Sequence, residues 1–283
     1  MQENSGYSPQ QMDDNGRHGS RLQLSHGKKL RLLLLAVSLL LPVGGGITAT
    51  DAPVTAASSP SLSAFCGEFD HLNSLIRDEK ISREEGRREV PRLLTRIKEL
   101  YQQEGGESVH RTDWRFPLQG YTVKAVGEGA SHGYLPKGYD YYDGNRHGGH
   151  PSLDIFIHDC NQDDLDDQTG KQVAVLTVAG GVVVARETEW QEGSKLKGGK
   201  YLWLYDPSTD HLFYYAHLRE ITVQIGQRMA PGDILGFVGR TGLNAHKKRS
   251  PTHLHLTCLS TSTNALHPEN IYRDLLRART VKQ

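Results

Sequence analysis

The chain has 283 residues, enough for one large domain or two modest ones, and its 36% hydrophobic and 23% charged residues are typical of a globular protein. Lys plus Arg and Asp plus Glu each number 33, so no bulk positive charge suggests a nucleic-acid partner. Three cysteines (Cys66, Cys160 and Cys258) exclude a disulfide scaffold, whereas 14 histidines raise the question of a metal held by imidazole and carboxylate groups.

Residues 1–50 have the pattern of a signal peptide or signal anchor. A basic stretch ending at Arg31 precedes the apolar run Leu32–Val43, and no charge occurs up to Thr50. The dense run is shorter than the roughly 20 residues that span a bilayer, which favours cleavage but leaves an uncleaved anchor open. Because the basic flank stays inside, we expect export to the periplasm or cell envelope, with membrane contact only through a retained leader at the inner membrane.

Residues 51–63 are rich in Ala, Ser, Thr and Pro and are predicted to be a linker. Apolar residues then recur at intervals of three and four, which predicts a helical hairpin over residues 64–105, with helices at 64–79 and 82–103. Two roles stay open for this hairpin: a packing spacer, or an inhibitory lid over a functional site.

Residues 106–283 are predicted to form a β-rich domain. Short runs of Val, Ile, Tyr and Leu are separated by closely spaced turns, which favours an antiparallel sheet or sandwich. The chain is therefore expected to be mainly β, preceded by an α-helical hairpin. The predicted strands are Val173–Val178, Val182–Thr188, Tyr201–Tyr205, His211–Leu218, Ile234–Val238 and Leu254–Leu259.

Two pairs of polar residues have spacings that suit a metal site. His253 and His255 lie two apart, so on a strand both imidazoles share one face. His150 and Asp154 lie four apart, and Pro151 excludes a continuing helix, so an extended chain places both on one side. Imidazole and carboxylate suit zinc, and three protein ligands with an open fourth position are typical of a catalytic site.

The order of these motifs resembles the lysostaphin-type, or LytM-like, zinc metallopeptidases, over about residues 140–260. The resemblance rests on the combination His150-x-x-x-Asp154, Tyr215-Ala216-His217-Leu218, the segment 225–239 from Ile-Gly-Gln to Phe-Val-Gly, Thr241-Gly242, and His253-Leu254-His255.

The resemblance implies one catalytic Zn²⁺ bound by His150, Asp154 and His255. It also implies catalytic roles for His217 and His253, and we assign His253 as the general base and His217 as its partner in orienting water or stabilising the tetrahedral intermediate. Upstream tyrosines assist in this family, so Tyr141 and Tyr142 are candidates either for transition-state stabilisation or for the wall of a groove.

Two features depart from the family pattern. The family usually has Gly where this chain has Ser152, and its loop before the His-x-His motif is typically shorter than Leu243–Thr252. Neither departure removes a predicted ligand, but the longer loop is expected to alter a substrate subsite.

The resemblance further implies an endopeptidase that hydrolyses peptide cross-links or stem peptides of bacterial peptidoglycan. The alternative is a LytM-like regulator without catalysis, which activates other cell-wall hydrolases; members of that kind typically lose ligands, whereas this chain keeps them. A lipoyl or biotinyl carrier, suggested by glycines in the segment 223–239, is disfavoured because the segment has no lysine to modify.

Two side features remain open. Asp159, Asn161 and Asp163 resemble positions one, three and five of a calcium loop, although the sixth position lacks Gly and the twelfth lacks Glu. These three residues are expected to form either a Ca²⁺ site or a solvated acidic loop. Strand parity places Cys160 and Cys258 on opposite faces, which disfavours a disulfide between them, but a bulge would defeat the count and leaves the pairing open.

Overall fold

The structure is a computed structural model that describes residues 60–263 and 265–282. The chain divides into two units, Met1–Thr55 and Ala56–Gln283, and the described residues all belong to the second. The predicted leader and most of the predicted linker therefore lie outside the described residues.

Short strands are the most numerous elements of the described residues, as expected from the turn-rich sequence. The helices are α1 (Leu62–Arg77), α2 (Arg83–Gln103) and α3 (Tyr272–Leu275), and the 3₁₀ helices are η1 (Arg111–Asp113), η2 (Val123–Ala125) and η3 (Tyr141–Arg146). The strands are β1 (Ser152–Phe156), β2 (Ala174–Leu176), β3 (Gly181–Glu187), β4 (Tyr201–Asp206), β5 (His211–Ala216), β6 (Leu218–Ile221), β7 (Arg228–Met229), β8 (Ile234–Val238), β9 (His253–Ser260) and β10 (His267–Pro268).

The strands form two antiparallel sheets. The large sheet has the order β1-β9-β5-β4-β3-β7, with β10 also paired to β9, and the small sheet has the order β2-β8-β6. This arrangement confirms the predicted fold class, a mainly β domain preceded by a helical region. Each of the six predicted runs contains a strand whose ends lie within two residues of the expected ones.

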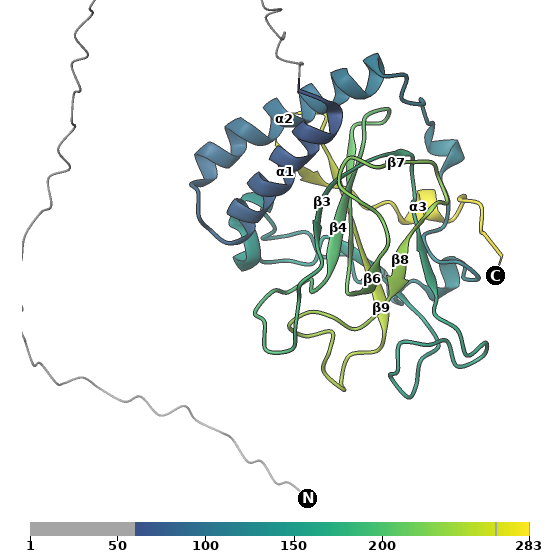
Figure 1. The fold of residues 1–283 in the computed structure, drawn as a ribbon. Helices are drawn as coiled ribbons and strands as arrows, with labels where there is room; N and C mark the ends of the chain where they lie inside the picture. The colour runs from purple at the N-terminus through teal and green to yellow at the C-terminus, as the bar shows by residue number, and fades with distance from the viewer. Residues whose placement is uncertain (1–59, 264, 283) are drawn as a thin grey trace, which may run out of the picture. The chain divides into compact units, whose positions relative to one another are not determined.

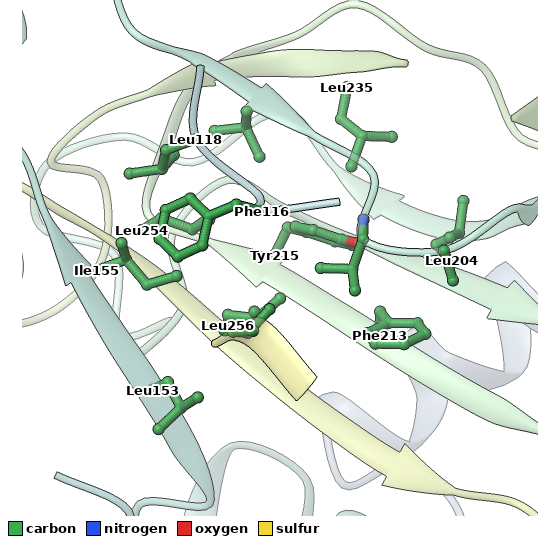
Figure 2. Close-up of a cluster of buried hydrophobic side chains, with 14 of the residues drawn as sticks. Phe116, Leu118, Leu153, Ile155, Leu204, Phe213, Tyr215, Leu235, Leu254 and Leu256 are labelled. Atoms are coloured by element: carbon green, nitrogen blue, oxygen red, sulfur yellow. The ribbon is translucent and has the colours of Figure 1, made fainter. Parts of the chain in front are cut away.

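One face of the large sheet packs into the main hydrophobic core. Side chains alternate along a strand, so Leu153 and Ile155 of β1 point into the same apolar cluster as Leu254 and Leu256 of β9. Figure 2 shows these four residues along the two strands, with Leu254 and Ile155 next to Phe116, which comes from the segment that follows the hairpin. The intervening residues of β1 and β9 therefore face the opposite side.

The helical hairpin covers part of that opposite face. Trp203 of β4 and Ala216 of β5 pack with buried residues of α1 and α2, and Figure 1 shows the two helices side by side against β3 and β4. Because Ala216 is the cross-strand partner of His255, the predicted zinc ligand shares a sheet face with the hairpin.

The hairpin is built by two amphipathic helices with capped starts. Ser61 accepts a hydrogen bond from the Ala64 N–H at the start of α1, and Ser82 accepts one from the Glu85 N–H at the start of α2. The first helix begins two residues before the expected hairpin boundary, at Leu62. Within residues 60–263 and 265–282, none of the helices combines the length and apolar character that a membrane crossing requires.

Candidate active site

The pairing of β1 with β9 places the predicted ligands opposite one another. Asp154 and His255 are cross-strand partners, and the His255 Nδ1 lies 2.9 Å from the Asp154 Oδ1. His150 comes just before β1, where its chain pairs with Leu135, and its Nε2 lies 3.2 Å from the Asp154 Oδ2. The extended chain predicted from Pro151 thus does bring His150 and Asp154 to one side.

His253 is the third imidazole near Asp154. It lies on the same face of β9 as His255, and its Nε2 is 3.8 Å from the Asp154 Oδ1. Its side chain is only 9% exposed, against 32% for His150, so the cluster opens to solvent on the His150 side.

His217 completes the cluster, but it does not lie on a strand as predicted. β5 ends at Ala216, and His217 forms the junction to β6 with a positive φ of 63°. Its ring centroid lies 4.9 Å from that of His253 and 5.3 Å from that of His255. A positive φ is unfavourable for a residue with a Cβ, so the surrounding structure must hold this conformation in place.

Three of the histidines orient their rings through backbone carbonyls. The Nδ1–H of His150 donates to Gly133 O at 2.9 Å, that of His217 to Thr241 O at 2.8 Å, and that of His253 to Pro251 O at 2.7 Å. In the neutral form each ring then carries its lone pair on Nε2, directed at the cluster.

His255 is oriented the other way round. Its Nδ1 faces Asp154, and its Nε2 lies 2.7 Å from the Ser152 Oγ. The sequence spacing therefore identified the ring, but which nitrogen faces the cluster became visible only in the structure.

Burial and neighbouring charge control the ionisation of these groups. Burial would raise the pKa of Asp154, but hydrogen bonds from His150 and His255 outweigh it and hold that pKa well below its usual value. The hydrogen bond to Asp154 raises the pKa of His150. Burial lowers the pKa of His217 and of His253, so both imidazoles are neutral at neutral pH and able to accept a proton.

The donor set fits a divalent cation. One ligand atom each from His150, Asp154 and His255 lie within 4.8 Å of one another, and so do those of a second group, His217, His253 and His255. With its Nδ1–H donated to Gly133 O, a neutral His150 directs its Nε2 lone pair at the carboxylate 3.2 Å away, and either protonation of His150 or a bound cation makes this contact favourable. The first group includes the carboxylate and matches the predicted ligands; one acid and two imidazoles are ligands that zinc accepts.

The two candidate tyrosines lie in the contact between η3 and the hairpin. The Tyr141 hydroxyl donates to the Asn73 Oδ1 at 3.0 Å, and its ring packs against Trp203. Tyr142 packs against the second helix, with Arg87 over its ring. Among the described residues, neither hydroxyl is hydrogen-bonded to a histidine of the cluster, and a transition-state role for either tyrosine stays a prediction.

Tyr141 does line a cavity beside the cluster, in agreement with the groove-wall alternative. One side of this cavity is formed by Ser152 and His255, and another by Asn73 and Arg77 of α1. The hairpin therefore contributes one wall of the cavity that lies next to the candidate site.

The predicted calcium loop is held together by its own hydrogen bonds. Both Asp159 carboxylate oxygens accept backbone N–H groups, from Asp163 and Asp164, and Thr252 also donates to Asp159. Asn161 donates its side-chain amide to Asp163. These bonds suit a self-contained acidic loop, and calcium binding there stays a prediction.

Cys160 and Cys258 do not form a disulfide. Both are free: Cys160 is exposed in the loop after β1, whereas Cys258 is buried in the core face of β9. The parity count disfavoured a disulfide, but it assumed that the strand continues to Cys160, whereas β1 ends at Phe156 and the chain then leaves the sheet.

Sequence reasoning missed the groups that orient the rings. The carbonyls of Gly133, Thr241 and Pro251 carry no side-chain signal, so no residue pattern indicates them. Ser152 and Thr257 were accessible in principle, since each lies two positions from a ligand and therefore on the same strand face.

The two sheets thus carry an aspartate and four histidines on one face, a donor set that could hold a metal ion. Residues 163–268 match peptidase family M23. The matched segment includes His217, His253 and His255 and begins after His150 and Asp154. This match confirms the LytM-like resemblance over the matched residues.

Solved structures similar to the chain include several peptidases. A putative glycyl-glycine endopeptidase LytM from Ruminococcus gnavus is 22% identical, with a TM-score of 0.40 and coverage of 66% of this chain and 74% of that one. A zinc-containing peptidase from Vibrio cholerae is 22% identical, with a TM-score of 0.35 and coverage of 56% and 38%. Lysostaphin from Staphylococcus simulans is 21% identical, with a TM-score of 0.35 and coverage of 56% and 52%.

The chain thus spans well under two thirds of the length of the last two proteins. No curated protein matches the chain.

Proposed function

We propose that this protein is an exported, zinc-dependent endopeptidase that hydrolyses peptide bonds in the cross-links or stem peptides of peptidoglycan. The observation that carries the proposal is the convergence of His150, Asp154 and His255, with two further neutral imidazoles beside them. The M23 match supports action on peptidoglycan, and the charge pattern of residues 1–50 supports export to the cell envelope.

In this proposal His150, Asp154 and His255 hold the zinc. Bound there, zinc would supply a Lewis acid that polarises the scissile carbonyl and lowers the pKa of water to about 7. His253 then accepts the proton of the attacking water at Nε2, because its Nδ1–H is already donated to Pro251 O.

His217 has the complementary role. Its Nδ1–H is donated to Thr241 O, so its Nε2 is the atom that faces the reacting groups and orients the water. Once protonated by the reaction, an imidazole beside the developing oxyanion stabilises it by charge and hydrogen bonding. Uptake of the water proton by one ring and its delivery to the leaving amine complete the hydrolysis.

The proposal is tested by digesting purified peptidoglycan with the protein, with and without a chelator, and identifying the released fragments by mass spectrometry. We expect chelator-sensitive cleavage that His150→Ala abolishes through loss of zinc, and that His253→Ala lowers about 10²- to 10⁴-fold while zinc is retained. His267→Ala, at an exposed histidine of β10, is the matched control and should behave as wild type.

Chelator-insensitive cleavage, or no cleavage by a folded and zinc-loaded protein, would refute the peptidase. In the second case, stimulation of another cell-wall hydrolase would identify the regulator instead. Full turnover by a zinc-loaded His253→Ala protein would refute only the assignment of the base.

A further inference from the structure

Ser152 and Thr257 form a buried pair of hydroxyls behind His255. They are cross-strand partners in β1 and β9, only 1% and 3% exposed, and their oxygens lie 2.6 Å apart. The Ser152 Oγ also lies 2.7 Å from the His255 Nε2. A continuous line of hydrogen bonds therefore runs from Thr257 through Ser152 and His255 to Asp154.

His255 needs this side-chain partner because of its place in the sheet. β9 lies between β1 and β5, and the His255 backbone is paired on both sides, with Asp154 and Ala216. Neighbouring carbonyls are engaged in the ladders, whereas the other three site histidines use carbonyls from outside the strands. The ring of His255 is instead oriented at Nε2 by the Ser152 side chain.

The hydroxyl pair admits two proton arrangements. In one, Thr257 donates to Ser152, Ser152 donates to the His255 Nε2, and the His255 Nδ1–H donates to Asp154. In the other, His255 Nε2–H donates to Ser152 and Ser152 donates to Thr257, which leaves the Nδ1 lone pair directed into the cluster. Each hydroxyl is both donor and acceptor, so the line reverses without moving a heavy atom.

We propose that Ser152 and Thr257 are positioning residues that set the tautomer of His255 and so present its Nδ1 lone pair to the zinc. This inference rests on the proposed zinc site. The Ser152 hydroxyl accepts the Nε2–H, which removes the proton from the ligand nitrogen, and Thr257 accepts the Ser152 hydroxyl proton and keeps it turned away from His255.

The proposal is tested by measuring zinc affinity in competition with a chromophoric chelator. We expect Ser152→Ala to bind zinc about 10- to 100-fold more weakly, as is typical when the hydrogen-bond partner of a metal-binding histidine is lost. Thr257→Val should weaken binding less, since the Ser152 hydroxyl remains, and Thr257→Ser should restore the wild-type affinity.

Ser260→Ala is the matched control, because Ser260 lies on the same strand and its hydroxyl bonds only to Ser262 among the described contacts. Thermal unfolding of each protein in chelator separates folding defects from metal binding. NMR of the His255 ring nitrogens in zinc-loaded protein gives a readout that packing alone does not move: an exchange-protected Nε2–H in wild type, and a rapidly exchanging one in Ser152→Ala.

Wild-type zinc affinity in Ser152→Ala, or a His255 ring protonated at Nδ1 in the zinc-loaded protein, would overturn the positioning role. If the wild-type protein binds zinc but cleaves no peptidoglycan, the proposed function is refuted. The zinc affinities of the Ser152 and Thr257 variants still test the positioning role in that case. A wild-type protein that binds no zinc would refute both.

Discussion

At the residue scale, Gly242 is the position that allows His217 to reach the cluster. A Cβ at Gly242 would lie 2.9 Å from the His217 Nδ1 and 2.4 Å from the Lys197 carbonyl oxygen, and its φ of +118° disfavours any L side chain. We expect Gly242→Ala to lower the free energy of unfolding by about 1–3 kcal/mol and to displace His217. Turnover should fall while bound zinc stays at the wild-type level, as measured by denaturant titration, peptidoglycan digestion and metal analysis.

Gly193→Ala is the control for backbone strain alone. Gly193 also has a positive φ, of +93°, but a Cβ added there would meet nothing within 4 Å. The Gly193→Ala protein should have a lower free energy of unfolding than wild type but the same turnover. Equal turnover in the two variants would show that the close approach of Gly242 to His217 has no catalytic consequence.

The polar residues of the site were predictable because strand parity and motif order depend only on local spacing. His253 and His255 two apart, and His150 and Asp154 four apart, needed no tertiary information. The orientations of the histidine rings, in contrast, could not be predicted without tertiary information. They depend on carbonyls such as Thr241 O, which the fold brings to His217 from 24 positions away.

At the element scale, the helical hairpin is part of the core of the domain. Asn73 of α1 is 5% exposed, accepts a hydrogen bond from the Tyr141 hydroxyl at 3.0 Å and donates one to the Tyr201 hydroxyl at 3.2 Å. We expect Asn73→Ala to cost about 1–3 kcal/mol of stability, since it leaves the buried Tyr141 hydroxyl without its acceptor and the Tyr201 hydroxyl with Arg77 as its remaining partner. The midpoint of urea unfolding measures the loss.

Asn244→Ala, at an exposed asparagine, is the control and should leave the midpoint unchanged. Below the unfolding transition, Asn73→Ala should keep wild-type peptidoglycan cleavage. An increase in cleavage would instead favour the inhibitory lid, because loosening a lid exposes the site that it covers.

The loop before the His-x-His motif is organised by Arg240. Its guanidinium donates to the carbonyls of Ser250 at 2.7 Å and Lys247 at 3.0 Å, and to the Thr252 hydroxyl at 3.0 Å. A lysine ammonium cannot donate these three hydrogen bonds in the planar geometry of the guanidinium. We therefore expect Arg240→Lys to displace the start of β9 and to lower turnover by up to about 100-fold, with zinc retained. Digestion rates and metal analysis test this expectation.

Lys248→Ala serves as the control on the same loop, since Lys248 is exposed. If Lys248→Ala reduced turnover as strongly as Arg240→Lys, the charge of the loop, and not its conformation, would be what matters.

The two long helices were predictable from periodicity, whereas the short strands β6 and β7 were not. α1 and α2 carry repeated apolar spacings over 16 and 21 residues, whereas β7 has two residues and β6 has four, two of them charged. Such short strands exist because a neighbouring strand offers free backbone groups, which is a property of the assembled sheet. His217 was predicted to lie on the same strand as His211 because an apolar run does not reveal where the backbone turns. In the structure β5 ends at Ala216.

At the scale of the whole molecule, Glu269 links segments that are far apart in the chain. Its carboxylate lies 2.8 Å from the Arg111 guanidinium of η1 and 2.9 Å from the His211 Nε2 at the start of β5. Partial burial would raise the pKa of Glu269, but the hydrogen bonds from His211 and Arg111 outweigh it and hold that pKa below its ordinary value of 4.5. The charged form is therefore favoured by folding.

A carboxyl whose pKa is lower in the folded state stabilises the protein above its unfolded pKa, and the benefit disappears as the pH falls through the folded pKa. We expect Glu269→Gln to lower the stability at pH 7 by about 1 kcal/mol, or about 2–4 °C in Tm, and the difference from wild type to shrink steadily below pH 4.5. Glu99→Gln removes an exposed pair with Arg96 on α2 and should change Tm little at any pH. A Tm difference for Glu269→Gln that is constant from pH 7 to strongly acidic solution would show that the ionised carboxylate does not tie these segments together.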